Sequence, residues 1–96
     1  KAPEYLFRTA KELEEYAGVY DFLPPDKVFT VEVRRGTLFI QLTGQPFLPV
    51  FETKKGTFEY DVVFASIEFE RDEASQIKRL HITQNGLKLP ALKRRK

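Results

Sequence analysis

The 96-residue sequence contains no cysteine, no methionine and no tryptophan, and it has a single histidine. The lack of cysteine excludes a disulfide framework, a thiolate nucleophile and a cysteine-based zinc site, but it leaves the cellular compartment open. No apolar run approaches the roughly 20 residues that a membrane-spanning helix needs, and no glycine-rich phosphate loop is present. The sequence therefore predicts no cofactor, no metal and no membrane span.

Neither sign of charge is in marked excess. The chain has 16 basic and 14 acidic residues, which give a formal net charge of +2. The last four residues, 93–96, are all basic, so the rest of the chain carries 12 basic and 14 acidic residues. Nucleic-acid binding requires a basic patch on the folded body, whereas the basic pairs here fall beside expected turns. We therefore expect no nucleic-acid partner and interpret 93–96 as a solvated basic tail.

Aromatic residues are plentiful, with nine phenylalanines and four tyrosines in a chain that is 42% hydrophobic. This composition is typical of a globular protein, and the length suffices for one small core. We expect a single domain over residues 1–96. The opening "KAPEYLF" has no initiator methionine and no apolar leader, so we expect a piece of a longer protein.

A short helix is predicted over about 9–17. Thr9 is a candidate N-cap with Glu12 three residues later, which is the spacing of a capping box. Leu13 and Tyr16 then share one helical face, and Gly18 ends the helix. Two turns are too few for a stable isolated helix, so this segment must pack against the rest of the protein.

From residue 18 to about 92, apolar residues recur at every second position, as in half-buried β-strands. Strands are expected near 18–22, 27–34, 37–43, 46–52, 57–60, 65–70, 77–84 and 87–92. The connections carry turn residues, namely Pro24-Pro25-Asp26, Arg35-Gly36, Gly44-Gln45, Lys54-Lys55-Gly56, 72–76 and Asn85-Gly86. The predicted fold is all-β with a short N-terminal helix: a small eight-stranded antiparallel up-and-down barrel, plugged at one end by the helix.

Three stretches carry a family resemblance: "LEEYAGVYD", "GTLFIQLTGQPFLPVFE" and "IEFERDEASQIKRLHITQNGLKLPALK". From about Leu13 to Lys93 the chain resembles a bacterial and archaeal family of small lipocalin-like domains of uncharacterised function. Members commonly lie C-terminal to serine hydrolases of the β-lactamase-like, penicillin-binding-protein-related class. The resemblance implies a lipocalin-like barrel whose partner is the hydrolase domain of a parent chain. One departure is Ser75-Gln76, where the family tends to have a glycine.

Candidate catalytic groups are few. Ser75 and Lys78 have the S-x-x-K spacing of β-lactamase nucleophiles, but a serine in a turn and a lysine in a strand would point apart. His81 alternates with Leu80 and Ile82, as expected of a surface strand residue, and it has no second imidazole or thiolate to help hold a metal. The outward Glu68 and Glu70 are typical of a solvated strand face. We therefore expect no catalytic residue and no enzyme activity in this chain.

One function that fits such a barrel is binding of a small hydrophobic ligand, since eight strands can just enclose one. The hypothetical lumen residues are Val31, Ile40, Phe58, Ile67, Phe69 and Ile82. These side chains are large and apolar, whereas a ligand pocket usually includes a few convergent polar groups. The composition of the inward-facing positions thus favours a barrel interior that is filled by the protein's own side chains. Binding of a small ligand is the alternative function.

The function favoured is an accessory interaction domain, acting in stability, oligomer assembly or control of access to the hydrolase active site. Its hypothetical interface residues are Gly44, Gln45, Pro46, Val62, Val63, Phe64, Asn85 and Gly86. Val62 to Phe64 stand near an expected hairpin turn, where apolar residues form a patch that needs a partner if they are exposed. Alternatively, they continue a strand into the core. The sequence also leaves open whether the chain associates with itself into a homo-oligomer.

Overall fold

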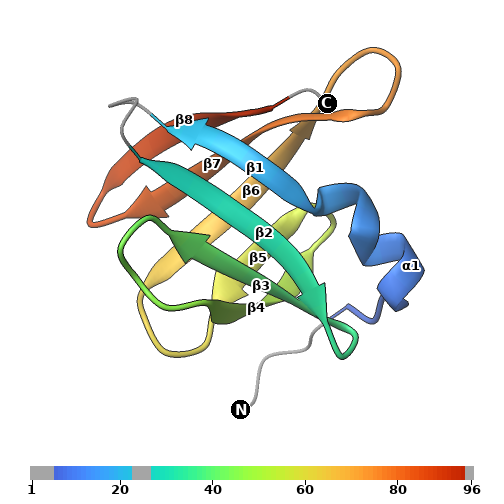
Figure 1. The fold of residues 1–96 in the computed structure, drawn as a ribbon, viewed down its shortest axis with the longest axis horizontal. Helices are drawn as coiled ribbons and strands as arrows, with labels where there is room; N and C mark the ends of the chain where they lie inside the picture. Colours follow the sequence, from blue (N-terminus) through green and yellow to red (C-terminus); the bar gives the residue numbers. More distant parts are fainter. Residues whose placement is uncertain (1–5, 23–26, 95–96) are drawn as a thin grey trace.

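The computed structural model describes residues 6–22 and 27–94, and these form a closed barrel (Figure 1). Helix α1 (Ala10–Leu13) and the 3₁₀ turn η1 (Glu14–Tyr16) precede eight strands: β1 (Gly18–Phe22), β2 (Val28–Arg34), β3 (Thr37–Leu42), β4 (Leu48–Lys54), β5 (Thr57–Tyr60), β6 (Ala65–Arg71), β7 (Ile77–Gln84) and β8 (Leu87–Lys93). Each strand pairs antiparallel with the next, and β1 pairs with β8. The predicted eight-stranded up-and-down barrel is confirmed. The opening residues 1–5, the turn at 24–26 and the tail residues 95–96 lie outside the described residues.

The predicted helix over 9–17 is correct at its start and wrong in its second half. Thr9 and Glu12 form the capping box, in which each backbone N–H donates to the other residue's side chain at 2.9 and 3.2 Å. The α-helix ends at Leu13 and tightens into the 3₁₀ turn, because Ala17 N–H donates to the Glu14 carbonyl only three residues back. The chain then becomes extended and enters β1.

Seven of the eight strands agree with the predicted ranges to within one residue at each end, but the strand expected over 46–52 begins at Leu48 and runs to Lys54. Pro46 has no N–H to donate to a strand ladder, and pairing of β3 with β4 begins with Ile40 opposite Leu48. A register shift between Glu52 and Lys54 then carries β4 into its turn.

The hairpin signal at Asn85-Gly86 is confirmed, since this pair joins β7 to β8. Both residues have left-handed backbone angles, with φ of 53° and 78°, which is the requirement of a type I′ turn. Such a turn matches the twist of the two strands and pairs Gln84 with Leu87 directly across it.

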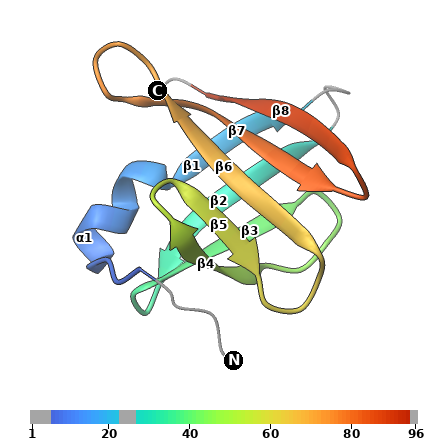
Figure 2. The same ribbon diagram turned by 180° about the vertical axis from the view of Figure 1, so that it is seen from behind.

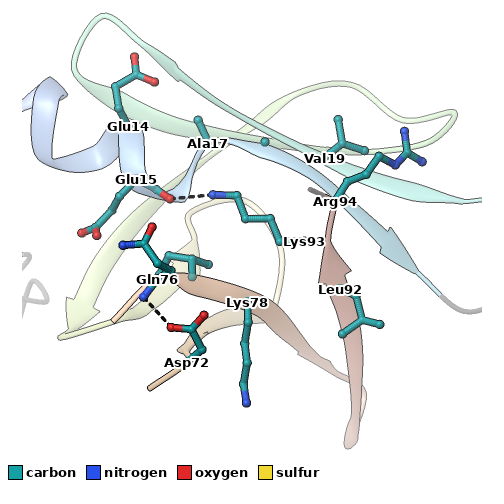
Figure 3. Close-up of a pocket in the computed structure, with 12 residues that line it drawn as sticks. Glu14, Glu15, Ala17, Val19, Asp72, Gln76, Lys78, Leu92, Lys93 and Arg94 are labelled. Carbon is teal, nitrogen blue, oxygen red and sulfur yellow. Dashed lines mark hydrogen bonds between the residues drawn. The ribbon is translucent and has the colours of Figure 1, made fainter. Parts of the chain in front are cut away.

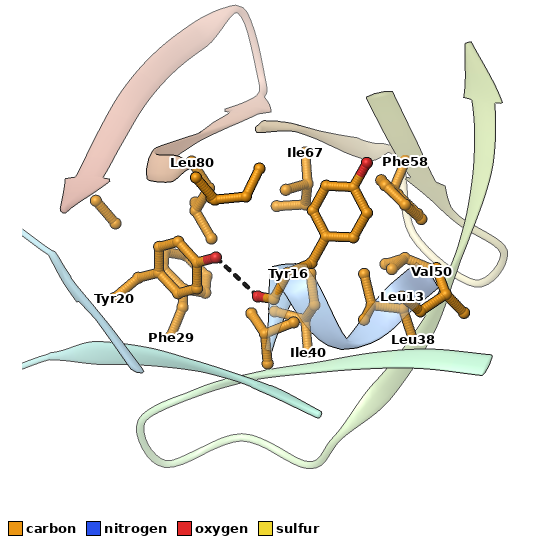
Figure 4. Close-up of a cluster of buried hydrophobic side chains, with 13 residues drawn as sticks. Leu13, Tyr16, Tyr20, Phe29, Leu38, Ile40, Val50, Phe58, Ile67 and Leu80 are labelled. Atoms are coloured by element: carbon orange, nitrogen blue, oxygen red, sulfur yellow. Dashed lines mark hydrogen bonds between the residues drawn. The ribbon is translucent and has the colours of Figure 1, made fainter. Parts of the chain in front are cut away.

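The barrel interior is filled by inward-pointing side chains from the strands and the helical segment (Figure 4). Tyr16 lies among them, with its ring centroid 5.2 Å from that of Phe58 and 4.6 Å from that of Phe69. The buried Tyr20 hydroxyl donates a 2.7 Å hydrogen bond to the Tyr16 carbonyl. The helical segment covers one end of the barrel (Figures 1 and 2), and Tyr16 is the side chain that plugs it.

We predict that Tyr20→Phe lowers the free energy of unfolding by about 1–3 kcal/mol, because it leaves the buried Tyr16 carbonyl without its donor. Urea denaturation measures this loss. The matched control is Tyr60→Phe, which removes the same atom from a tyrosine whose hydroxyl has no hydrogen bond to the described residues. The control should change the stability by no more than about 0.5 kcal/mol. Equal losses in the two variants would contradict the role of the Tyr20–Tyr16 bond.

Candidate functional site

The up-and-down topology sorts the connections into two ends of the barrel. The helical segment and the turns after β2, β4 and β6 lie at one end, which we call the helix end. The loops at 43–47, 61–64 and 85–86 lie at the other, which we call the loop end (Figures 1 and 2). All three predicted interface segments, namely Gly44-Gln45-Pro46, Val62 to Phe64 and Asn85-Gly86, therefore meet at the loop end.

The six predicted lumen residues point into the barrel. Four of them, Val31, Ile40, Phe58 and Ile67, are no more than 1% exposed. The other two, Phe69 and Ile82, are partly buried and pack against this core. The interior at these positions is occupied by the protein's own side chains, which contact one another where a lipocalin-type ligand would lie.

Val62, Val63 and Phe64 do not continue a strand into the core, so that alternative is wrong. Strand β5 ends at Tyr60 and β6 begins at Ala65. The exposed fractions of the three residues between them are 63%, 41% and 101%. The three side chains form an apolar surface at the loop end, and whether that surface binds a partner stays a prediction.

A cavity of about 110 Å³ opens at the loop end. It is lined by lumen residues Ile40 and Ile82 together with interface residues Gln45, Pro46 and Val63. The two sets of residues that the sequence suggested for different functions thus meet in one place. The cavity is smaller than the roughly 300–1,000 Å³ of a typical ligand pocket.

A larger groove of about 1020 Å³ lies at the helix end, between the start of β1, the end of β8 and the turn after β6 (Figure 3). Several charged side chains in and beside this groove make hydrogen bonds and ion pairs within the protein. Lys93 Nζ donates to the Glu15 carbonyl at 3.1 Å, and the Asp72 carboxylate accepts from the backbone N–H of Gln76 at 3.0 Å. The Arg94 guanidinium pairs with Asp21. These groups close the barrel seam and brace the turn after β6.

Glu52 is not among the site residues predicted from the sequence, yet it occupies an unusual position. It is the one buried charged residue in the described part of the chain, and its side chain is 1% exposed. Its carboxylate accepts from Arg8 Nε at 2.7 Å, Arg8 Nη2 at 3.1 Å and the Gly56 N–H at 2.8 Å. The hydrogen bond to Glu52 raises the pKa of Arg8. A charged residue two positions after the inward Val50 was the available signal.

The Glu52 contacts also attach the N-terminal segment to the barrel. Besides the two bonds from the Arg8 side chain, the Leu6 N–H donates to the Glu52 carbonyl at 2.8 Å. Two points of the segment before α1 are thereby held on β4 at the helix end. The direction in which the chain enters the domain is set by these bonds.

The S-x-x-K pair is not arranged for catalysis. Ser75 lies in the turn after β6 with φ of 64°, and Lys78 lies on β7 with its Nζ 3.1 Å from Glu70. The left-handed angle at Ser75 is one that glycine adopts most easily. Arg71 Nη1 donates to the Ser75 carbonyl at 2.8 Å and helps to hold this turn.

His81 lies on the outer face of β7, where its Nε2 is 2.9 Å from a Glu70 carboxylate oxygen. Within residues 6–22 and 27–94, no three or more histidine, cysteine or acidic residues gather in a group that could hold a metal ion.

The same described residues, 6–22 and 27–94, include no helix with the length and apolar character needed to cross a bilayer.

The model of a family described as a domain of unknown function (DUF3471) matches residues 7–93, which include the helical segment and all eight strands. No curated protein matches the chain.

We predict that Arg8→Met costs about 3 kcal/mol of stability, because it leaves the Glu52 carboxylate buried without its cation. Glu52→Met should cost less, since the released Arg8 can reach water. The double variant should lose less than the sum of the two single losses, and urea denaturation of all three measures that coupling. The control is Lys88→Met, which breaks an exposed pair with Glu68 and should cost less than about 1 kcal/mol. Simple additivity would contradict the coupling.

A second prediction concerns acid stability. Hydrogen bonds from His81 and then Lys78 lower the pKa of Glu70 from 4.5 to about 2. Because the folded-state pKa lies below the unfolded one, ionised Glu70 stabilises the fold above about pH 4.5, and this contribution is lost as the pH falls towards 2. Glu70→Gln should therefore be less stable than wild type near neutral pH, and the difference should shrink across that range. A difference that persists unchanged to pH 2, measured by urea denaturation, would contradict the assignment.

Proposed function

The chain belongs to the DUF3471 family, and from that premise we propose that it is a non-catalytic accessory domain of a longer protein. The other part of that protein is a serine hydrolase of the β-lactamase-like class. The family description assigns no function, so the hydrolase rests on the sequence resemblance to lipocalin-like domains that follow such enzymes. The domain acts by holding its neighbour in a defined place, and it supplies no catalytic group.

The observation that carries this proposal is the attachment of the N-terminal segment through Arg8, Leu6 and Glu52. A loosely tethered domain has no need of a buried ion pair in the segment that leads into it. Such a pair costs desolvation and is worth keeping where it sets a specific geometry. Here that geometry is the direction from which a preceding domain would reach the barrel.

Two further observations support a non-catalytic role. The interior is occupied by core side chains such as Phe58 and Ile67, which leaves the outer surface and the two ends for contacts. The basic side chains of Lys78 and His81 both contact the Glu70 carboxylate, and the backbone carbonyl of Ser75 accepts a hydrogen bond from Arg71 in the turn after β6.

Small-ligand binding is the second candidate, and the cavity at the loop end favours it. The cavity reaches the inward faces of Ile40 and Ile82, and Gln84 and Tyr60 add polar atoms near its lining. At about 110 Å³ it would take a ligand of about one ring. Native mass spectrometry of the purified chain distinguishes the two functions. We expect the mass of the protein alone, and a bound compound that is released on denaturation would favour the ligand carrier.

The accessory role predicts a division of activity between the two parts of the longer protein. The isolated chain should hydrolyse neither p-nitrophenyl butyrate nor a peptide p-nitroanilide above the rate in buffer. Removal of residues 7–94 from the longer protein should change the number of subunits in its assembly, measured by light scattering, or change its ratio of peptide to ester turnover by about threefold, which corresponds to under 1 kcal/mol in relative barrier height.

Two outcomes would overturn the accessory role. One is turnover by the isolated chain. The other is a longer protein whose subunit number and two rates are unaffected by the removal. A preceding domain that has no hydrolase activity would overturn the hydrolase assignment alone.

A further inference from the structure

Phe64 is fully exposed at the tip of the loop between β5 and β6, with an exposed fraction of 101%. Phenylalanine offers roughly 150–250 Å² of apolar surface, and complete exposure of such a side chain to water is unfavourable. Val62 beside it is 63% exposed. No described contact explains why an aromatic ring projects from this loop.

The cavity at the loop end lies beside Phe64, because it is lined by Val63 and Ala65 on either side of that residue. Ile40, Leu42 and Ile82 line it together with the polar side chains of Gln45 and Gln84, and its volume is about 110 Å³. An apolar protein cavity of about 150 Å³ holds a benzene molecule. A somewhat smaller recess that is open on one side therefore suits a phenyl ring inserted from solvent.

Phe64 does not fill this recess in its own molecule. The residues on either side of it, Val63 and Ala65, both line the recess, whereas Phe64 does not. A 3.0 Å hydrogen bond from the Ala65 N–H to the Val63 carbonyl holds the three residues in this arrangement. The Phe64 ring therefore lies outside the recess that its two neighbours line.

We propose that the loop end binds the loop end of a second copy of this chain, with Phe64 of each copy in the recess of the other. The projecting ring and the recess belong to the same surface of the same molecule. A twofold axis therefore satisfies both at once, which is the self-complementary arrangement of an isologous dimer. Each copy thereby buries an aromatic side chain that its own fold leaves in water.

The surroundings of Phe64 favour a second copy over a charged partner. In the described part of the connections at this end, residues 27, 43–47, 61–64 and 85–86, the charged residues are Lys27 and Asp61, which have opposite signs. Two identical surfaces can thus meet without strong like-charge repulsion.

The apolar surface extends beyond the loop. Ala65 pairs with Gln84, and Gln84 pairs with Leu87, so Leu87 lies about two strand spacings, or roughly 10 Å, from the base of the loop. Leu87 and Leu89 are 62% and 39% exposed. Together with Val62 to Phe64 these residues offer on the order of 600 Å² per copy, near the lower limit of about 1,200 Å² in total for a specific interface. The dimer is therefore a weak one.

The two ends of the described chain lie away from the loop end. The first and last described residues, Leu6 and Arg94, are held at the helix end through Glu52 and Val19, on the opposite side of the barrel (Figure 1). A domain joined at either of them leaves the loop end available. The dimer rests on the loop end alone, so its test is separate from that of the hydrolase assignment.

The test is sedimentation velocity of the isolated chain at concentrations from about 10 µM to about 1 mM, where an interface of this size associates. We expect a concentration-dependent dimer, and Phe64→Ser should weaken its association about tenfold or more. The matched control is Phe7→Ser, which changes a phenylalanine that is 92% exposed before the helix. This control should leave the dimer unchanged. A wild-type chain that remains monomeric, or a Phe64→Ser variant that associates like wild type, overturns the proposal.

The recess is tested separately with Ala65→Leu, which fills it and leaves Phe64 in place. This variant should be monomeric, yet it should associate with the Phe64→Ser variant, because that pair retains one ring and one open recess. If Ala65→Leu does not fold, the methyl NMR signals of Ile40 and Ile82 give the same information. They should shift with concentration in wild type and not in Phe64→Ser, and constant shifts in both proteins overturn the proposal.

Discussion

Burial of Tyr16 within the barrel is the constraint on which the rest of the structure depends. Its ring packs against Phe58 and Phe69, and its carbonyl accepts the Tyr20 hydroxyl, so the helical segment is joined to three strands at once. A helix this short is not stable without such packing. In turn, the barrel end is closed only because the helical segment supplies this side chain. Because the interior is used for stability in this way, the sites left for function are the outer surface and the two ends.

The two ends are built from different interactions. At the helix end, an ion pair between the partly exposed Arg8 and the buried Glu52 holds the segment before the helix on β4. Ion pairs at this depth depend on geometry, because an unpaired buried charge is costly. At the loop end, Phe64 and its neighbours offer apolar area with little charge, which tolerates a range of approach angles and favours weak, reversible contact. A fixed attachment at one end and an adaptable contact at the other suit a domain that positions a neighbour.

Local sequence signals were reliable where the interaction that they report is itself local. The capping box joins Thr9 to Glu12, and Asn85-Gly86 tightens one hairpin, so each could be recognised from a few residues. The predicted helix is longer than the observed one, because the 3₁₀ turn at 14–16 is set by tertiary packing of Tyr16. The start of β4 was placed two residues early because alternation continues through Pro46, although that residue has no N–H to donate.

The sequence by itself determined the strands, their turns, the closure of the barrel and the apolar identity of its interior. These follow from alternation with a period of two and from backbone angles that few residues adopt. Only the tertiary structure decided that Glu52 is buried, because its partner Arg8 lies 44 residues away along the chain. It also decided that Phe64 is exposed while Val63 faces the recess. The reason is that burial of a loop residue depends on contacts between distant segments, which no local pattern records.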